Sequence, residues 1–220
     1  MRAPRPMLLL LAGLLASCAG ATVPTASPTS PPEVTATPMP STDDKLELTS
    51  GAELEPGTYT RSGFAPRITF DVGSGWRAVQ LFDGFFDIQQ QVGSPHVIAV
   101  QFARPISVAG ADGPVPAERA AGAVEALSTN ADLTTLETSD SRIGGLVGRQ
   151  ITVENAGTVH RTVVHVPPGP LGIDPGRRLW IAFFDTEDGL LAIMIGGSVA
   201  QWDAALAAAE PVLESVTIGP

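Results

Sequence analysis

The histidines are the first residues to test for chemistry, and the chain has three, at positions 96, 160 and 165. His160 and His165 end the segment HRTVVH. If this segment is a strand, their odd separation predicts that they lie on opposite faces. No cysteine or carboxylate cluster accompanies them to complete a metal site. We therefore expect two surface histidines, with no metal and no cofactor.

Two further groups of side chains have the chemistry of a binding surface. Arg177 and Arg178 are adjacent and could clamp a carboxylate or a phosphate. The alternative is a solvated strand edge. Phe85 and Phe86, with Phe82, surround one turn in FDGFFDIQQQ. If exposed, they would form an apolar binding lip, and if buried they belong to the core.

Local catalytic motifs are absent from the sequence. It contains no G-x-S-x-G, no phosphate-binding glycine loop and no H-E-x-x-H. The glycines of VGSGW and GGLVG are better explained by turns and bends. We therefore predict a non-enzymatic protein without catalytic residues. A hydrolase built from residues far apart in the sequence stays an alternative, because such sites are recognised by geometry.

The only cysteine follows a short apolar run. Residues 7–15 are apolar after a basic start, and the run is too short for the roughly 20 residues that cross a bilayer. The segment Leu15-Ala16-Ser17-Cys18 resembles the lipobox of bacterial lipoproteins. This resemblance implies a signal peptide over 1–17, lipidation of Cys18, and anchoring on the extracytoplasmic side of the cell membrane. The alternative is an ordinary signal peptide with an incidental cysteine.

Residues 18–44 are rich in proline, threonine and serine and hold almost no bulky apolar side chain. Such a segment buries too little surface to offset the entropy of ordering. We predict a disordered tether, whose full reach is about 80 Å at roughly 3.1 Å per residue.

The charge of the chain limits its partners. The net charge is −10, Lys45 is the one lysine, and the arginines are scattered. Phosphate backbones need a basic surface, so we expect no nucleic-acid binding. The sequence also lacks the polybasic patch that would bind anionic lipid. Membrane contact is thus expected through the lipid on Cys18.

Residues 45–220 are predicted to form one α+β domain, an antiparallel β-sheet flanked by helices. Alternation or apolar runs indicate strands, and helices are expected from Pro116 to about residue 130 and after a Ser198–Gln201 capping box. The hairpin 179–195 does not alternate, so it should lie in the middle of the sheet. The remaining strands are expected at residues 67–72, 78–82, 85–90, 96–104, 142–154 and 216–218.

The order of these segments resembles a known family. ITFDVGSGW, a mid-chain helix, IGGLVGRQITVE, the central hairpin and VLESVTI follow the pattern of the PsbP-like sandwich family, which includes LpqN-type lipoproteins. The resemblance implies an α/β/α sandwich and a non-catalytic accessory or assembly role.

Three functions remain open at this point. The first is a lipid-anchored domain that binds an envelope protein, for which the proline-rich loop 166–176 is the expected contact. The second is a carrier of a lipid or another apolar ligand, with a cavity lined by residues such as Phe85, Trp180 and Met194. The third is the hydrolase with a non-local site.

Overall fold

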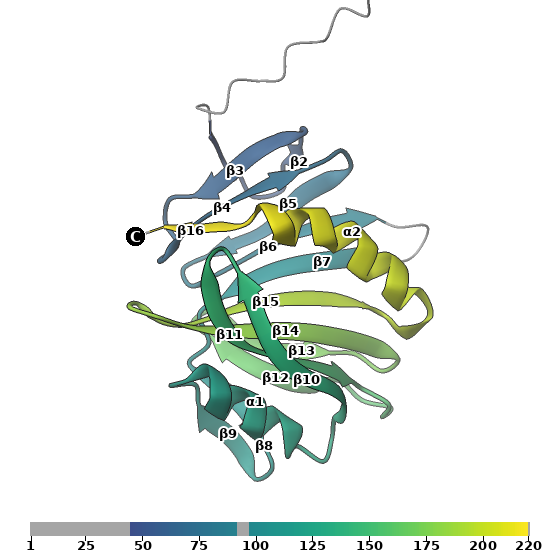
Figure 1. Cartoon of the computed structure of the whole chain (residues 1–220). Helices are drawn as coiled ribbons and strands as arrows, with labels where there is room; N and C mark the ends of the chain where they lie inside the picture. Colours follow the sequence, from purple (N-terminus) through teal and green to yellow (C-terminus); the bar gives the residue numbers. More distant parts are fainter. Residues whose placement is uncertain (1–44, 92–96, 220) are drawn as a thin grey trace, which may run out of the picture. The chain divides into compact units, whose positions relative to one another are not determined.

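The computed structural model describes residues 45–91 and 97–219, which belong to one compact unit. The predicted signal peptide, Cys18, the tether and His96 lie outside these residues. The chain is built on an eight-stranded sheet in which all neighbouring strands are antiparallel (Figure 1). Its order is β10 (Thr134–Ile143), β11 (Leu146–Glu154), β14 (Arg177–Thr186), β15 (Gly189–Ser198), β7 (Val97–Ala103), β6 (Phe85–Gln91), β5 (Trp76–Phe82) and β2 (Glu53–Leu54).

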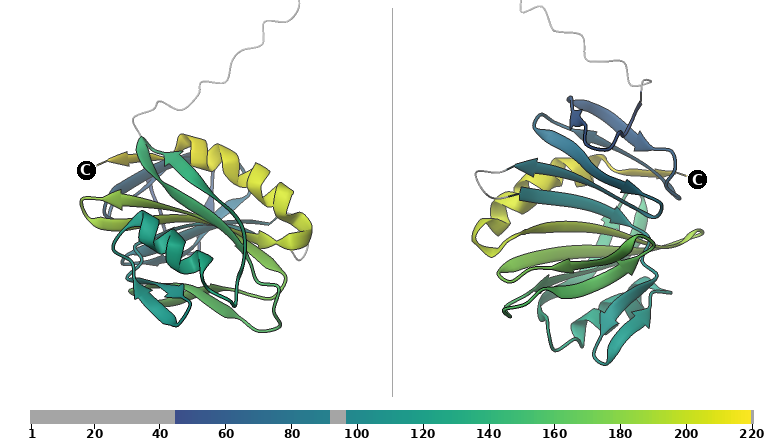
Figure 2. Two further views of the ribbon diagram at one scale, coloured as in Figure 1. Left: turned by 60° about the horizontal axis from the view of Figure 1, so that its bottom comes forward. Right: turned by 180° about the vertical axis from the view of Figure 1, so that it is seen from behind.

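Each face of this sheet is covered by one helix and one small sheet (Figure 2). On the first face, here called the α2 face, lie α2 (Trp202–Ser215) and the strands β1 (Leu46–Glu47), β3 (Gly57–Arg61), β4 (Arg67–Val72) and β16 (Thr217–Gly219). On the second, the α1 face, lie α1 (Ala120–Ser128) and the strands β13 (Gly169–Ile173), β12 (Arg161–Val166), β8 (Ser107–Gly110) and β9 (Gly113–Pro116).

The predicted α+β class, an antiparallel sheet with helices against it, is confirmed. The predicted α/β/α layering is met only in part, because the structure is dominated by strands. Helices of 9 and 14 residues are too short to cover an eight-stranded sheet. The two four-stranded sheets cover further apolar surface that the helices leave open.

The hairpin of β14 and β15 lies in the middle of the large sheet, as predicted. Ile181 and Phe183 pack into the core on the α1 face, and Ala182 and Phe184 pack into the core on the α2 face. All four side chains are fully buried. An apolar residue at every position is therefore required here.

Several local predictions need correction. Gly144 and Gly145, expected to mark a bend within one strand, form the two-residue turn between β10 and β11, with φ of 58° and 83°. The expected capping box is wrong, because α2 begins at Trp202 after a 3₁₀ turn (Val199–Gln201), and neither N-cap side chain makes the capping hydrogen bond to the start of its helix. α1 begins at Ala120 rather than Pro116, since Gly113–Pro116 pairs with β8 as β9.

The predicted partner-binding loop 166–176 is largely a strand. Gly169–Ile173 forms β13, which pairs with β12 around a turn at Pro167 and Pro168. Proline and glycine concealed this strand because they are depleted in strands generally, and β13 is an edge strand, where proline is tolerated.

Candidate functional site

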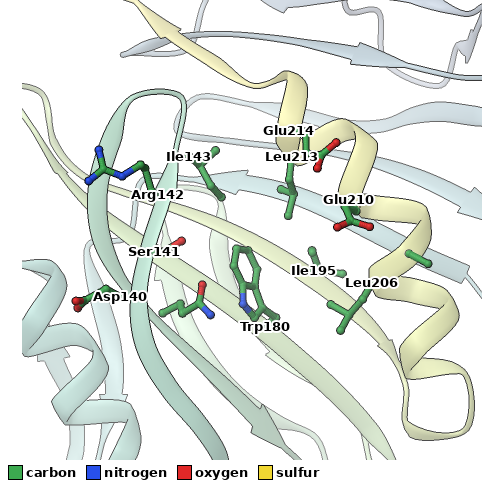
Figure 3. Close-up of a pocket in the computed structure, with 12 residues that line it drawn as sticks. Asp140, Ser141, Arg142, Ile143, Trp180, Ile195, Leu206, Glu210, Leu213 and Glu214 are labelled. Carbon is green, nitrogen blue, oxygen red and sulfur yellow. The ribbon is translucent and has the colours of Figure 1, made fainter.

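α2 leaves part of the α2 face uncovered, and a groove of about 570 Å³ lies there (Figure 3). It runs between the helix and strands β10, β11 and β14. We call it the α2 groove. It is lined by Asp140, Ser141, Arg142, Ile143, Gln150, Trp180, Ile195, Leu206, Ala207, Glu210, Leu213 and Glu214.

The floor of the α2 groove follows from strand register. Ile195, Trp180 and Thr152 are directly opposed on β15, β14 and β11, so their side chains form one row across the sheet. Ile195 is buried, whereas the indole of Trp180 is partly exposed. The floor is thus apolar under α2 and becomes polar toward β10.

The wall of the groove comes from one side of α2. Leu206, Glu210 and Leu213 are spaced by four and three residues, which places them on one face of a helix. Both leucines are partly buried, while Glu210 and Glu214 are exposed. Apolar side chains therefore lie beneath a rim of carboxylates.

The rim charges are unequally paired. Within residues 45–91 and 97–219, Glu210 and Glu214 form no ion pair. Across the groove, Asp140 Oδ1 lies 3.1 Å from Arg149 Nη1. In Figure 3, the side chains of Asp140 and Arg142 extend away from Trp180. The side of the groove formed by α2 is consequently negative.

Arg177 and Arg178 do not form the predicted clamp. They lie on β14, an inner strand, and adjacent residues of a strand point to opposite faces. Arg178 Nε is 2.7 Å from Glu154 Oε2, and the Arg177 guanidinium donates to the carbonyl of Val97 at 3.4 Å. The expectation of a shared anion site, and that of a strand edge, are both wrong.

Phe85 and Phe86 are not an exposed lip. Both are buried, on opposite faces of β6, which confirms the alternative that they are core residues. Phe82 alone of the three is exposed. The expected carrier cavity also needs correction, because Phe85 and Met194 are fully packed and only Trp180 lines an opening.

His160 and His165 line one cavity of about 570 Å³ beside β8 and β9, contrary to the predicted separation. The physical reason is a bulge in β12 between Thr162 and Val164, which adds one residue and breaks the alternation. His160 Nδ1 lies 2.8 Å from Asp174 Oδ1. No group of three metal-ligating side chains occurs in the described part of the chain.

A serine–histidine contact also exists on the α1 face. Ser107 Oγ lies 3.2 Å from His165 Nδ1, on directly opposed positions of β8 and β12. Catalytic histidines of this kind are oriented by a third group. Within residues 45–91 and 97–219, no carboxylate lies at ion-pair distance from His165. The pair is therefore a cross-strand contact without the geometry of a triad.

One carboxylate is buried away from the α2 groove. Asp87 on β6 accepts hydrogen bonds from the backbone N–H of Gln80 at 2.7 Å and from Gln89 Nε2 at 2.8 Å. Gln80 follows a bulge in β5, and the carboxylate satisfies the N–H group there. Burial raises the pKa of Asp87 despite these hydrogen bonds.

Sequence reasoning missed most of the α2 groove. The Leu206, Glu210 and Leu213 spacing was an available signal for a helix with one mixed apolar and acidic side. The strand β10 had no such signal, because its residues are mostly polar and exposed. A groove between these two elements depends on how the sheet and the helix pack.

The fold and the groove together define a strand-rich antiparallel α+β domain with an open groove beside its C-terminal helix. No protein-family profile matches the sequence, and no curated protein matches it either. No helix among the described residues is long and apolar enough to cross a membrane.

Solved structures give more remote likenesses. The chain is similar to the cyanobacterial PsbP of Synechocystis, with 12% identity, a TM-score of 0.43 and coverage of 77% of this chain and 96% of that one. It is similar to LpqN of Mycobacterium tuberculosis, a protein involved in cell envelope biogenesis, with 10% identity, a TM-score of 0.41 and coverage of 80% and 90%. A structure from Bacteroides thetaiotaomicron has 11% identity, a TM-score of 0.35 and coverage of 70% and 45%. The PsbP-like and LpqN-type resemblance predicted from the sequence is thus met by structures of both kinds.

Proposed function

We propose that this protein is a lipid-anchored, extracytoplasmic and non-catalytic domain of the cell envelope, which holds a partner protein in the α2 groove. The lipobox at Cys18 and the segment 18–44 supply the anchor and the tether in this proposal. The observation that carries it is the α2 groove, with Trp180 in its floor and, on its rim, two carboxylates that form no ion pair with any described residue.

The groove favours a partner segment that combines an apolar side chain with a positive charge. Leu206, Leu213 and the Trp180 ring offer apolar contact, and an indole face also attracts cations. Glu210 and Glu214 would attract the charge. A groove of about 570 Å³ holds only a few side chains, so a short segment of the partner is bound.

The test is photocrosslinking in cells, with a photoreactive amino acid placed on one or the other side of α2. Ala207 lines the α2 groove and is exposed, and Ala204 is exposed outside it. We expect a discrete protein adduct from position 207 that is absent from position 204. The adduct should also disappear in the Glu210→Lys, Glu214→Lys double variant. Equal adducts from both positions, or none from 207, would contradict the proposal.

A second candidate is a carrier of a small ligand that has an apolar part and a positive charge. The volume of the groove lies in the range of ligand pockets, roughly 300–1,000 Å³. Native mass spectrometry of the protein, extracted in mild detergent, separates the two candidates. A bound small molecule whose occupancy falls in the Trp180→Ala variant would favour the carrier. A ligand-free mass together with the position-207 adduct would favour partner binding.

The anchor is tested separately by intact mass. Protein extracted from its own membrane is expected to have the mass of a chain cleaved before Cys18 plus acyl chains. The Cys18→Ala variant should lack that addition and should leave the membrane fraction. An unmodified wild-type mass would remove the anchor from the proposal and leave the α2 groove unaffected.

A further inference from the structure

The two edges of the eight-stranded sheet are closed to different degrees. One edge ends in β2, a strand of two residues, and the other ends in β10, a strand of ten. A long edge strand presents unpaired N–H and C=O groups to any strand of matching register, and proteins usually shorten or cover such edges. Asp140 and Arg142 of β10 are also exposed, on either side of the buried Ser141. The β10 edge is therefore available for pairing.

The register of β10 fixes which backbone groups point outward. Ile143 and Leu146 flank the two-residue turn and are directly opposed, as the last hydrogen-bonded pair of such a hairpin. Residues two apart share the same orientation in an antiparallel ladder. The N–H and C=O groups of Thr138, Asp140 and Arg142 thus point away from β11.

We infer that β10 pairs antiparallel with β10 of a second copy of this chain, around a twofold axis at Ser141. In this register Arg142 lies opposite Asp140 of the partner subunit, and Asp140 lies opposite Arg142 of the partner subunit. Two cross-strand ion pairs then flank the axis on one face of the joined sheet. Opposite charges at directly opposed positions stabilise strand pairing.

Neighbouring registers are less favourable. Because a twofold axis perpendicular to the sheet preserves its faces, the axis must pass through a residue. An axis at Asp140 would place two carboxylates opposite each other. An axis at Ser139 would place Asp140 opposite Thr138 of the partner subunit. Ser141 is the centre that pairs both charges.

Asp140 remains free to take part in this contact. Its side chain is 80% exposed, although Oδ1 already lies 3.1 Å from Arg149 Nη1. Arg142 forms no ion pair among the described residues. A second copy would supply it with a partner.

The chain's own N-terminal segment is a poor occupant of the β10 edge. Residues 18–44 contain six prolines, three acidic residues and no basic residue. Proline cannot donate to a strand ladder, and the segment offers Asp140 no positive charge.

The pairing would join two sheets into one and place both α2 grooves on the same side of it. A short strand pair buries less than the roughly 1,200–2,000 Å² of stable interfaces. The dimer is consequently weak, and its population depends on protein concentration. The inference does not depend on what the α2 groove binds.

Sedimentation velocity over a concentration series tests the pairing, with the full chain carrying Cys18→Ala. We expect the wild-type residues to give a monomer–dimer equilibrium. Asp140→Arg and Arg142→Asp should each weaken association by about tenfold or more, because two attractions per dimer become repulsions. The Asp140→Arg, Arg142→Asp double variant restores opposite charges and should regain dimerisation.

Two controls accompany this measurement. Arg149→Ser removes the ion pair of Asp140 within the chain and should leave association unchanged. Circular dichroism verifies that every variant is folded. A protein that stays monomeric to millimolar concentration would overturn the inference. So would a double variant as weak as the singles. A monomer whose position-207 adduct is lost in Thr138→Pro, a change on the β10 edge outside the groove lining, would overturn it as well and would assign the edge to a strand of another protein.

Discussion

The α2 face of the large sheet has two halves that differ in cover. Over β5, β6 and β7, the small sheet of β3 and β4 closes the face completely, and Phe64, Phe70, Phe86 and Phe102 pack ring against ring. Over β10, β11 and β14 the same face is open beside α2, and its side chains include Ser141, Thr152, Gln150 and Trp180. One half is closed core, and the other is open to solvent.

The difference shows where a site arises in this fold. Both halves belong to one continuous sheet, so strand geometry alone does not distinguish them. What differs is the covering element: a sheet covers its half fully, whereas a single helix leaves a groove at its side. The side chains of the large sheet differ accordingly: phenylalanines lie under the small sheet, and polar side chains lie under the opening.

The largest expected effect is in the closed half. Phe86→Ala should lower the free energy of unfolding by about 3–5 kcal/mol, because it removes a fully buried ring that contacts three others. Urea denaturation followed by circular dichroism measures the change. A loss below about 1 kcal/mol would mean that the closed half does not hold the fold together.

Leu206→Ala makes the matching change in the open half. This side chain is partly exposed against the α2 groove, so we expect a loss of only about 1 kcal/mol. The same urea experiment gives the value. Equal losses for Leu206→Ala and Phe86→Ala would remove the contrast between the halves.

The charge of the open half predicts a preference among ligands. Dodecyltrimethylammonium, below its micelle concentration, should change the fluorescence of Trp180 more strongly than dodecyl sulfate does. The Glu210→Gln, Glu214→Gln double variant should weaken the cation's apparent affinity by about threefold, as expected for exposed charges. Trp180→Phe is the control, because Trp76 and Trp202 are buried and should report little. A stronger response to the sulfate would contradict the negative charge of the α2 groove.

The smallest effect concerns Asp87, which neighbours Phe86 on β6 but faces the other side. Since burial raises its pKa in the folded state, folding favours the protonated form, and the stability that this form contributes is lost as pH rises through the folded pKa. The wild type should therefore gain stability relative to Asp87→Asn as the pH is lowered from 7 to about 4, where an unfolded aspartate titrates. Urea midpoints at the two pH values measure this. A constant difference would show that the carboxyl does not titrate there.

The sequence allowed correct prediction of the elements with strong hydrophobic patterns. β4 was predicted with its observed ends, and the β14–β15 hairpin was placed correctly because neither strand alternates. β8, β9 and β13 were missed, since their proline and glycine residues are typical of loops. Edge strands tolerate such residues because only one side must be paired.

The site was less predictable, for physical reasons. Trp180 was named as a cavity residue, but Phe85 and Met194 were named with it, and burial depends on covering elements that the sequence does not reveal. The bulge in β12 likewise reversed the expected placement of His165. One extra residue in a strand exchanges its faces, and a local sequence gives no reliable sign of it.

The order of strands in the large sheet has a consequence for how the chain folds. β5, β6 and β7 are neighbours in sequence, and so are the members of the β10–β11 and β14–β15 hairpins, whereas β15 and β7 pair across a long separation. Closing a long loop costs entropy before its contacts are gained. The three local groups should therefore acquire hydrogen-exchange protection first, and the seam where Ile193 opposes Phe102 should be protected last.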